Sequence, residues 1–227
     1  MAEKAEVVSS HFFRRVMVVL TFALAMAYLE SAVVVYLQRA LSMTPETLFP
    51  LRSKSVLGNL GAIEVGREFA TLVMLVAVGW LAGRCGIERF AWVAVAFGIW
   101  DIGYYFFLWI FIGWPTGLGT YDLLFLIPVP WVAPVWAPML VSVALIFFGL
   151  AIARRSRSSS SLQLRLRDGG LMVCGGVIVI FSFTWHFRAT LSGAVPTTFA
   201  WPIFTIGMAL AVLGISPLYR TGRRTKL

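Results

Sequence analysis

The sequence predicts an all-α integral membrane protein, a bundle of six transmembrane helices. The first observation is composition, because 59% of the 227 residues are hydrophobic and only 13% are charged. In a soluble domain about a quarter of the residues carry a charge. The second is six apolar runs, each long enough to cross a hydrocarbon core of about 30 Å as a helix. The third is that lysines and arginines lie mainly in the short segments between these runs, a pattern typical of multi-pass membrane proteins.

The six predicted spans form a single transmembrane domain over residues 1–227. The first span follows Arg14 and Arg15 and contains a small-residue stretch, as a signal peptide would. Its apolar run continues to Leu37, however, so we expect an uncleaved helix. In chain order the predicted spans are 16–37, 61–81, 90–112, 131–153, 171–187 and 200–218.

Charge predicts the direction of these spans. With the N-terminus inside, fourteen of the 19 lysines and arginines fall on cytoplasmic segments, including a basic linker over 154–169. Positively charged residues are enriched in cytoplasmic loops, so both termini should be cytoplasmic and the protein should lie in the cell (inner) membrane. Although the net charge is +9, this distribution argues against a nucleic-acid partner.

The segment 113–138, between the third and fourth spans, is rich in proline and tryptophan. It has five prolines, and its tryptophans suit the membrane interface, where indole is amphipathic. The apolar part is too short and too often broken by proline to cross the membrane. We therefore expect a re-entrant or interfacial segment on the outer face, with a helix lying flat in the interface as the alternative.

Cysteine and histidine exclude several kinds of site. Cys85 and Cys174 form no CxxC pair, so neither a disulfide framework nor a thiolate zinc site is expected. The chain has two histidines, and His11 precedes the first span, so no haem is predicted. Gly117 and Gly119 follow no predicted strand, so no nucleotide-binding loop is predicted either.

Acidic residues gather toward the outer side of the predicted bundle. At about 1.5 Å of rise per residue, the acids of the first three spans lie roughly 5–14 Å below the outer boundary, and His186 of the fifth span lies at about 8 Å. Glu3, Glu6, Glu88 and Asp168 fall in cytoplasmic segments, where acids need no special explanation. The acids predicted in the outer half are Glu30, Glu64, Glu68, Asp101 and, in the 113–138 segment, Asp122.

These groups predict a cation or proton site. Charged side chains within a membrane usually face a protein interior or a water-filled cavity, and they often mark function. Four carboxylates, Arg67 and a neutral imidazole would sum to −3, so bound protons or a cation must compensate. A divalent metal is predicted, with ligands drawn from Glu30, Glu64, Glu68, Asp101 and His186. The ExxH pairing of soluble di-iron bundles is absent, which argues against a dinuclear metal site.

Roles follow from depth and helical spacing. Glu68 and Asp101 lie deepest and are the candidates for catalytic acid or base. Tyr104 and Tyr105, three and four residues after Asp101, could donate hydrogen bonds to it. Arg67 is expected to support the site or anchor an anionic group.

Several of these residues also have a purely structural interpretation. Arg67 could pair with Glu30 or Glu64 only to hold helices together. Asp122 could be a turn or cap residue, and His186 a hydrogen-bonded interfacial residue.

The predicted function is that of a multi-pass membrane protein with a buried, carboxylate-rich site that binds a cation or proton and acts on a membrane-borne substrate. No hydrolase, transferase or redox motif is present, so the sequence does not establish an enzyme. One alternative is a non-catalytic subunit of a larger membrane complex. Another is a small cation- or proton-coupled transporter, which the apolar inner halves of the spans disfavour. The expected partners are membrane lipids and either further copies of the chain or a larger complex.

Overall fold

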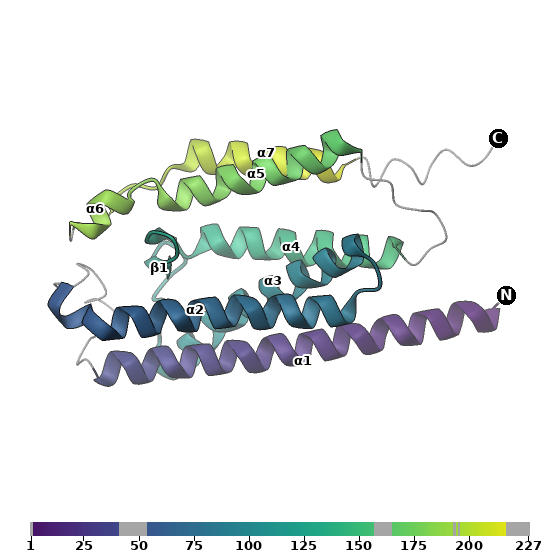
Figure 1. Cartoon of the computed structure of the whole chain (residues 1–227), viewed down its shortest axis with the longest axis horizontal. Coiled ribbons are helices and arrows are strands. Elements are labelled where there is room, and N and C mark those ends of the chain that lie inside the picture. Colours follow the sequence, from purple (N-terminus) through teal and green to yellow (C-terminus); the bar gives the residue numbers. More distant parts are fainter. Residues whose placement is uncertain (1, 41–53, 157–164, 193, 195, 217–227) are drawn as a thin grey trace. The chain divides into compact units, whose positions relative to one another are not determined.

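The computed structural model describes residues 2–40, 54–156, 165–192, 194 and 196–216, with the side chains of 2–9 and 54–60 left outside this description. Five of its helices are long and apolar enough to cross a membrane. The elements are α1 (Ala2–Ala40), α2 (Lys54–Ala82), α3 (Gly86–Ile112), β1 (Tyr121–Phe125), β2 (Trp131–Pro134), α4 (Trp136–Arg155), α5 (Leu166–Thr184), α6 (Phe187–Leu191) and α7 (Trp201–Ile215), and Figure 1 shows their course.

The predicted helical, membrane-type architecture is confirmed, and the last three predicted spans differ in detail. The fifth membrane candidate, Leu166–Leu191, contains α5 and the short α6, which are separated at Trp185 and His186. The sixth predicted span corresponds to α7, an apolar helix of 15 residues and thus about 22 Å. Residues 157–164 of the predicted basic linker and residues 217–227 of the basic C-terminal segment lie outside the described residues.

The chain divides into two compact units. Unit 1 comprises Met1–Met43, Phe69–Leu118 and Trp136–Ser160, and so contains α1, the second part of α2, α3 and α4. Unit 2 comprises Thr44–Glu68, Gly119–Val135 and Ser161–Leu227, and so contains the first part of α2, both strands, α5, α6 and α7.

In unit 1, α3 packs against both α1 and α4 through small residues. A Cβ added at Gly98 would lie 2.6 Å from the carbonyl oxygen of Ser142, and one at Gly149 would lie 2.7 Å from that of Ala91. Glycine therefore allows the backbones to approach closely, as is common between membrane helices. Helix α3 ends at Gly113, whose φ of 68° is left-handed and whose N–H donates to Trp109.

Hydrogen bonds show that α1 and α2 are antiparallel. Arg15 Nη1 donates to the carbonyl oxygen of Ala82 at 2.7 Å, and Thr71 Oγ1 donates to Glu30 Oε2 at 3.1 Å. Residue numbers thus rise along α1 as they fall along α2.

The pair α3 and α4 is also antiparallel. Ser142 Oγ donates to Asp101 Oδ2 at 2.8 Å, and at the other end Cys85 Sγ lies 3.5 Å from Ser156 Oγ. Cys85 is the N-cap of α3, and Ser156 follows the last residue of α4. The predicted alternation of direction is therefore confirmed for this pair as well.

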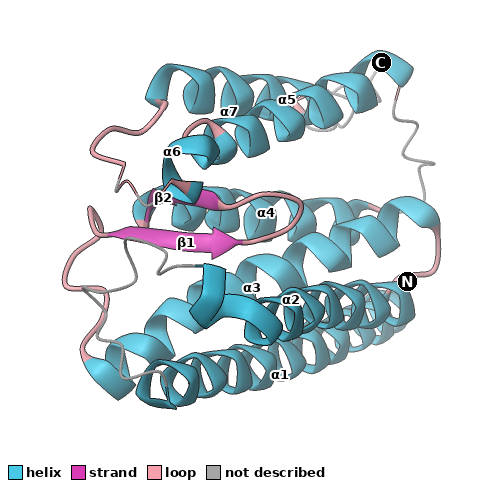
Figure 2. Cartoon of the chain, turned by 60° about the vertical axis from the view of Figure 1, so that its left-hand side comes forward, coloured by secondary structure: helices cyan, strands magenta, loops and turns pink. Residues whose placement is uncertain are grey.

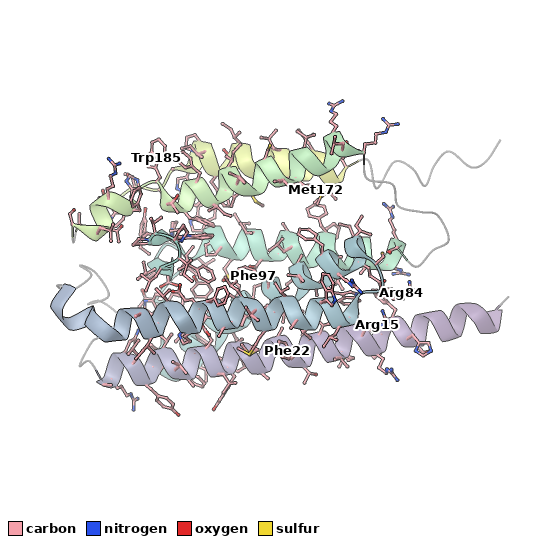
Figure 3. The ribbon with its side chains drawn as sticks, viewed as in Figure 1. Arg15, Phe22, Arg84, Phe97, Met172 and Trp185 are labelled. Carbon is pink, nitrogen blue, oxygen red and sulfur yellow. The ribbon has the colours of Figure 1, made fainter. Side chains whose placement is uncertain are left out.

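Helices α1 and α3 run parallel. Arg15 Nη1 lies 3.5 Å from Glu88 Oε1, and farther along both helices Ser31 Oγ donates to the carbonyl oxygen of Tyr104 at 3.0 Å. All four helices therefore share one end, which we name the arginine end; Figure 3 shows two of its side chains, Arg15 and Arg84. Its described arginines are Arg14, Arg15, Arg84, Arg89, Arg154 and Arg155.

In unit 2, α5 and α7 form a close pair. A Cβ at Gly175 would lie 2.5 Å from the backbone nitrogen of Ala211, and one at Gly207 would lie 2.8 Å from that of Val179. Pro202 stands in the first turn of α7, where its missing N–H costs no helical hydrogen bond.

The proline-rich segment contains an antiparallel hairpin, β1 and β2, which the sequence did not predict (Figure 2). Tyr121 pairs with Pro134, and Leu123 pairs with Val132. The alternative of a flat helix here is therefore wrong, and so is the predicted start of the fourth span at 131. A helix beginning there would carry Pro138 in its second turn, whereas α4 begins at Trp136 and holds Pro138 in its first turn, where proline is tolerated.

Candidate functional site

Asp101, in the middle of α3, is a buried carboxylate held by a neighbouring helix. Its side chain is 7% exposed, and its Oδ2 accepts the hydrogen bond from Ser142 on α4. Ser142 is itself buried and is the only hydroxyl residue in the stretch from Leu140 to Ala153, which was the signal that could have identified it.

Glu30, on α1, is held in the same way. It is buried and accepts the hydrogen bond from Thr71, a buried residue of α2. The next residue, Ser31, is fully buried and joins α1 to α3 through its bond to the Tyr104 carbonyl. Polar contacts thus link α1 to α2, α1 to α3, and α3 to α4. We name these side chains the polar layer of unit 1: Glu30, Ser31, Thr71, Asp101 and Ser142.

The two acids of the polar layer lie at similar distances from the arginine end. Glu30 is 15 residues beyond Arg15 on α1, which corresponds to about 22 Å of helix. Asp101 is 13 residues beyond Glu88 on α3, which corresponds to about 20 Å. Because α1 and α3 are parallel and paired at that end, these two acids lie at a similar level along the bundle. Their depth in a membrane stays a prediction.

The tyrosines after Asp101 lie in an aromatic group. Tyr104 stacks on Trp100 with ring centroids 6.4 Å apart, and Tyr105 is buried with its ring centroid 6.2 Å from that of Trp114. Their predicted role as donors to Asp101 stays a prediction.

Glu68, the deepest acid of α2 predicted from the sequence, belongs to unit 2 and holds the hairpin. It is buried, and its carboxylate oxygens lie 2.9 and 3.1 Å from the backbone nitrogen of Leu126, which donates to them. Leu126 directly follows β1. A carboxylate satisfies a backbone donor that the hairpin leaves unpaired, so Glu68 has a clear positioning role.

Glu64 and Arg67 pair with each other one turn apart on α2. Arg67 Nε lies 3.0 Å from Glu64 Oε2, and a second contact joins the guanidinium to Oε1. Both side chains are about one-fifth exposed. Of the two predicted partners for Arg67, Glu64 is thereby confirmed.

Asp122 and His186 occupy local positions in unit 2. Asp122 is 4% exposed, and its Oδ1 accepts a hydrogen bond from the N–H of Leu123 at 2.8 Å. It lies within β1 and pairs with Ala133, so the predicted role as a turn or cap residue in a wet segment is wrong. His186 is the N-cap of α6 rather than a residue within a continuous helix. Its carbonyl accepts hydrogen bonds from Thr190, while its imidazole makes no hydrogen bond or ion pair with the described residues.

The predicted gathering of metal ligands is not found. Among the residues that the structure describes, no three histidine, cysteine, aspartate or glutamate side chains are grouped so that they could hold a metal ion. The carboxylates of the predicted ligand set instead bond to a hydroxyl, a backbone N–H or an arginine. Binding of a divalent metal stays a prediction, and the described part of the chain does not support a carboxylate cluster.

Glu88, at the arginine end, is the main residue that the sequence interpretation missed. It was expected to be an ordinary cytoplasmic acid, but it is fully buried. It accepts hydrogen bonds from the backbone nitrogen and Nε of Arg84, both at 3.1 Å, and it pairs with Arg15. The signal available was Arg84 four residues before Glu88, directly ahead of an apolar helix. Asp168, also expected to be ordinary, is buried in the first turn of α5.

Cys85 lies beside this buried acid and is exposed. The hydrogen bond with Ser156 lowers the pKa of the thiol from its ordinary value, and nearby backbone hydrogen bonds contribute in the same direction. The thiolate is the reactive form of cysteine, so the lowered pKa favours reaction at Cys85.

Comparisons of the chain with protein-family models, with curated proteins and with solved structures find no match. The functional argument therefore depends on the geometry of the polar layer and of the arginine end.

Proposed function

We propose that this chain is a multi-pass membrane protein that binds a proton or a cation at the buried carboxylates of its polar layer, in the outer half of the bilayer. The observation that carries the proposal is the pairing of Asp101 with Ser142 and of Glu30 with Thr71, each a buried carboxylate on a neutral hydroxyl. Burial of a carboxylate disfavours its charged form, and this cost favours uptake of a proton or a cation.

The hydroxyl groups suit reversible protonation. A serine or threonine hydroxyl donates to a carboxylate, and it can rotate to accept a hydrogen bond once the acid is protonated. The hydrogen bond between the hydroxyl and the acid can therefore form in both states without rearrangement of the helices. Two such pairs at one level in the membrane are suited to proton exchange with a membrane-borne substrate, the reaction class that we propose.

The test is infrared difference spectroscopy on protein in lipid nanodiscs, titrated with acid. We expect the carbonyl stretch of a protonated carboxylic acid, with a component that is lost in Asp101→Asn. In the matched variant Ser142→Ala the component should remain and shift in frequency, because only its hydrogen bond changes. A spectrum of Asp101→Asn identical to wild type at every pH would contradict proton binding at this residue.

Cation binding is tested separately on the same preparation. Elemental analysis after a chelator wash and the thermal midpoint in added Na⁺, Mg²⁺, Ca²⁺ or Zn²⁺ at constant ionic strength report a bound ion. A stoichiometric metal, or a stabilisation that disappears in Asp101→Asn, would select the cation form of the proposal. If neither measurement shows an ion and the infrared component is also absent, the proposal fails.

The second candidate is a non-catalytic subunit of a membrane complex. The same hydrogen bonds favour it, because they link all four helices of unit 1 and polar contacts of this kind stabilise helix packing. This function predicts that Asp101→Asn lowers the free energy of unfolding. It also predicts that the infrared spectrum of the wild type contains no protonation signal from Asp101 for the variant to lose. Copurification of a stoichiometric partner would favour this function over the first.

A further inference from the structure

We propose that the arginine end of unit 1 binds the headgroup of an anionic phospholipid, with Arg84 and Arg89 contacting the phosphate and Trp80 and Phe90 contacting the acyl chains. This inference goes beyond the proposed function, because it concerns the arginine end, about 20 Å along the helices from the polar layer.

Arg84 presents an oriented guanidinium. Its Nε and its backbone nitrogen both donate to the buried carboxylate of Glu88, which holds the side chain in place. Its two Nη groups have no hydrogen-bond or ion-pair partner among the described residues, and the side chain is 55% exposed. A guanidinium fork fixed at one edge and open at the other matches the geometry of a phosphate.

Arg89 places its positive charge beside exposed apolar side chains. Its guanidinium carbon lies 4.0 Å from the centroid of the Trp80 ring, and its Nε faces the carbonyl oxygen of Gly83 at 3.5 Å. Trp80 and Phe90 are both more than half exposed, and Leu81 is 84% exposed. Fixed positive charge directly beside exposed apolar side chains suits an amphipathic ligand, and tryptophan is enriched at this level of membrane proteins.

The balance of charge at this end favours anionic ligands. The six described arginines of the arginine end face one buried described carboxylate, Glu88, which leaves an excess of +5. The contact between Cys85 and Ser156 ties the turn after α2 to the end of α4, where Arg154 is exposed. Each basic residue near a surface of anionic lipid contributes about fivefold in affinity.

The experiment is native mass spectrometry of the purified full chain with equal amounts of phosphatidylglycerol and phosphatidylcholine. We expect phosphatidylglycerol adducts to dominate for wild type. The double variant Arg84→Gln/Arg89→Gln should lower the ratio of the two adducts by about tenfold or more. Arg39→Gln, which removes the same charge from the far end of α1, is the control and should retain the wild-type ratio.

Further variants keep the proposal falsifiable if Arg84→Gln misfolds. Arg84→Lys preserves the charge but not the guanidinium fork and should lose less of the preference than the double variant, while Arg89→Gln alone should lose about fivefold. Excess inorganic phosphate should leave the adducts in place, since acyl contacts also hold the lipid. A wild type without preference, an equal loss in Arg39→Gln, or displacement by phosphate alone would overturn the proposal, the last in favour of a soluble anion.

Discussion

At the scale of single residues, the buried acids of this protein differ in the kind of hydrogen-bond partner that each one has. Asp101 and Glu30 each bond to a hydroxyl, Glu68 to a backbone N–H, and Glu88 to arginines. A hydroxyl can hydrogen-bond either protonation state of an acid, whereas two guanidinium groups favour the charged form of a carboxylate. An acidic side chain therefore anchors the arginine end, and in the polar layer it is the group at which we propose proton exchange.

The anchoring role predicts that Glu88→Gln destabilises the protein strongly. Loss of the charge removes the shared counter-ion of Arg84 and Arg15 and weakens the hydrogen bonds to it, which should cost about 1.5–3 kcal/mol because both arginines are partly exposed. Denaturant unfolding in mixed micelles measures the change. Glu64→Gln is the matched control, because its pair with Arg67 is partly exposed and should contribute about 0–1 kcal/mol. Equal losses in the two variants would contradict the assignment.

The lowered pKa of Cys85 predicts faster alkylation than for an ordinary thiol. Below its pKa, a lower value means a larger thiolate fraction, so Ser156→Ala should raise the pKa and slow the reaction at neutral pH. Above both pKa values the two rates should converge. The measurement is the iodoacetamide rate against pH in a Cys174→Ala background, since both cysteines are exposed. Superimposable profiles would refute the role of Ser156.

At the scale of elements, close helix contacts depend on where glycine faces. Gly175 of α5 packs against the backbone of α7, whereas the adjacent Gly176 has nothing within 4 Å of an added Cβ. Helical periodicity alone places these two glycines on different faces, but it does not say which face meets a helix. The packing of α5 and α7 makes that distinction.

This contrast predicts opposite outcomes for two neighbouring substitutions. Gly175→Leu should separate α5 from α7 and cost at least about 1–3 kcal/mol of stability, since the clash is with backbone atoms. Gly176→Leu should be close to neutral. Thermal unfolding of both variants in nanodiscs measures the difference, and tolerance of Gly175→Leu equal to that of Gly176→Leu would show that the pair does not pack as described.

At the scale of the whole molecule, membrane topology depends on α7. With six spans both termini are cytoplasmic, as the distribution of positive charge predicts; if α7 does not cross, the termini lie on opposite sides. Helix α7 has 15 residues, fewer than the roughly 20 that a span usually needs. The basic residues after it nevertheless favour a cytoplasmic C-terminus.

We therefore expect a fluorescent-protein fusion to be active at either terminus in the cytoplasm, and a periplasmic phosphatase fusion to be inactive at both. Removal of the four basic residues Arg220, Arg223, Arg224 and Lys226 should weaken this preference, because they hold the last segment inside. Phosphatase activity at the C-terminus of the unaltered chain would show that α7 does not cross.

The sequence by itself determined the apolar helices, their alternating direction in unit 1 and the shared level of Glu30 and Asp101. These properties depend on residue hydrophobicity and on the constant rise of a helix, both of which are local. Only the tertiary structure decided that Ser142 donates a hydrogen bond to Asp101, that Leu126 donates one to Glu68 and that Glu88 is buried. Those bonded pairs lie 41 and 58 residues apart, and their choice depends on how separate elements align and pack. The hairpin was missed for a related reason, because two short strands become stable only when they pair with each other.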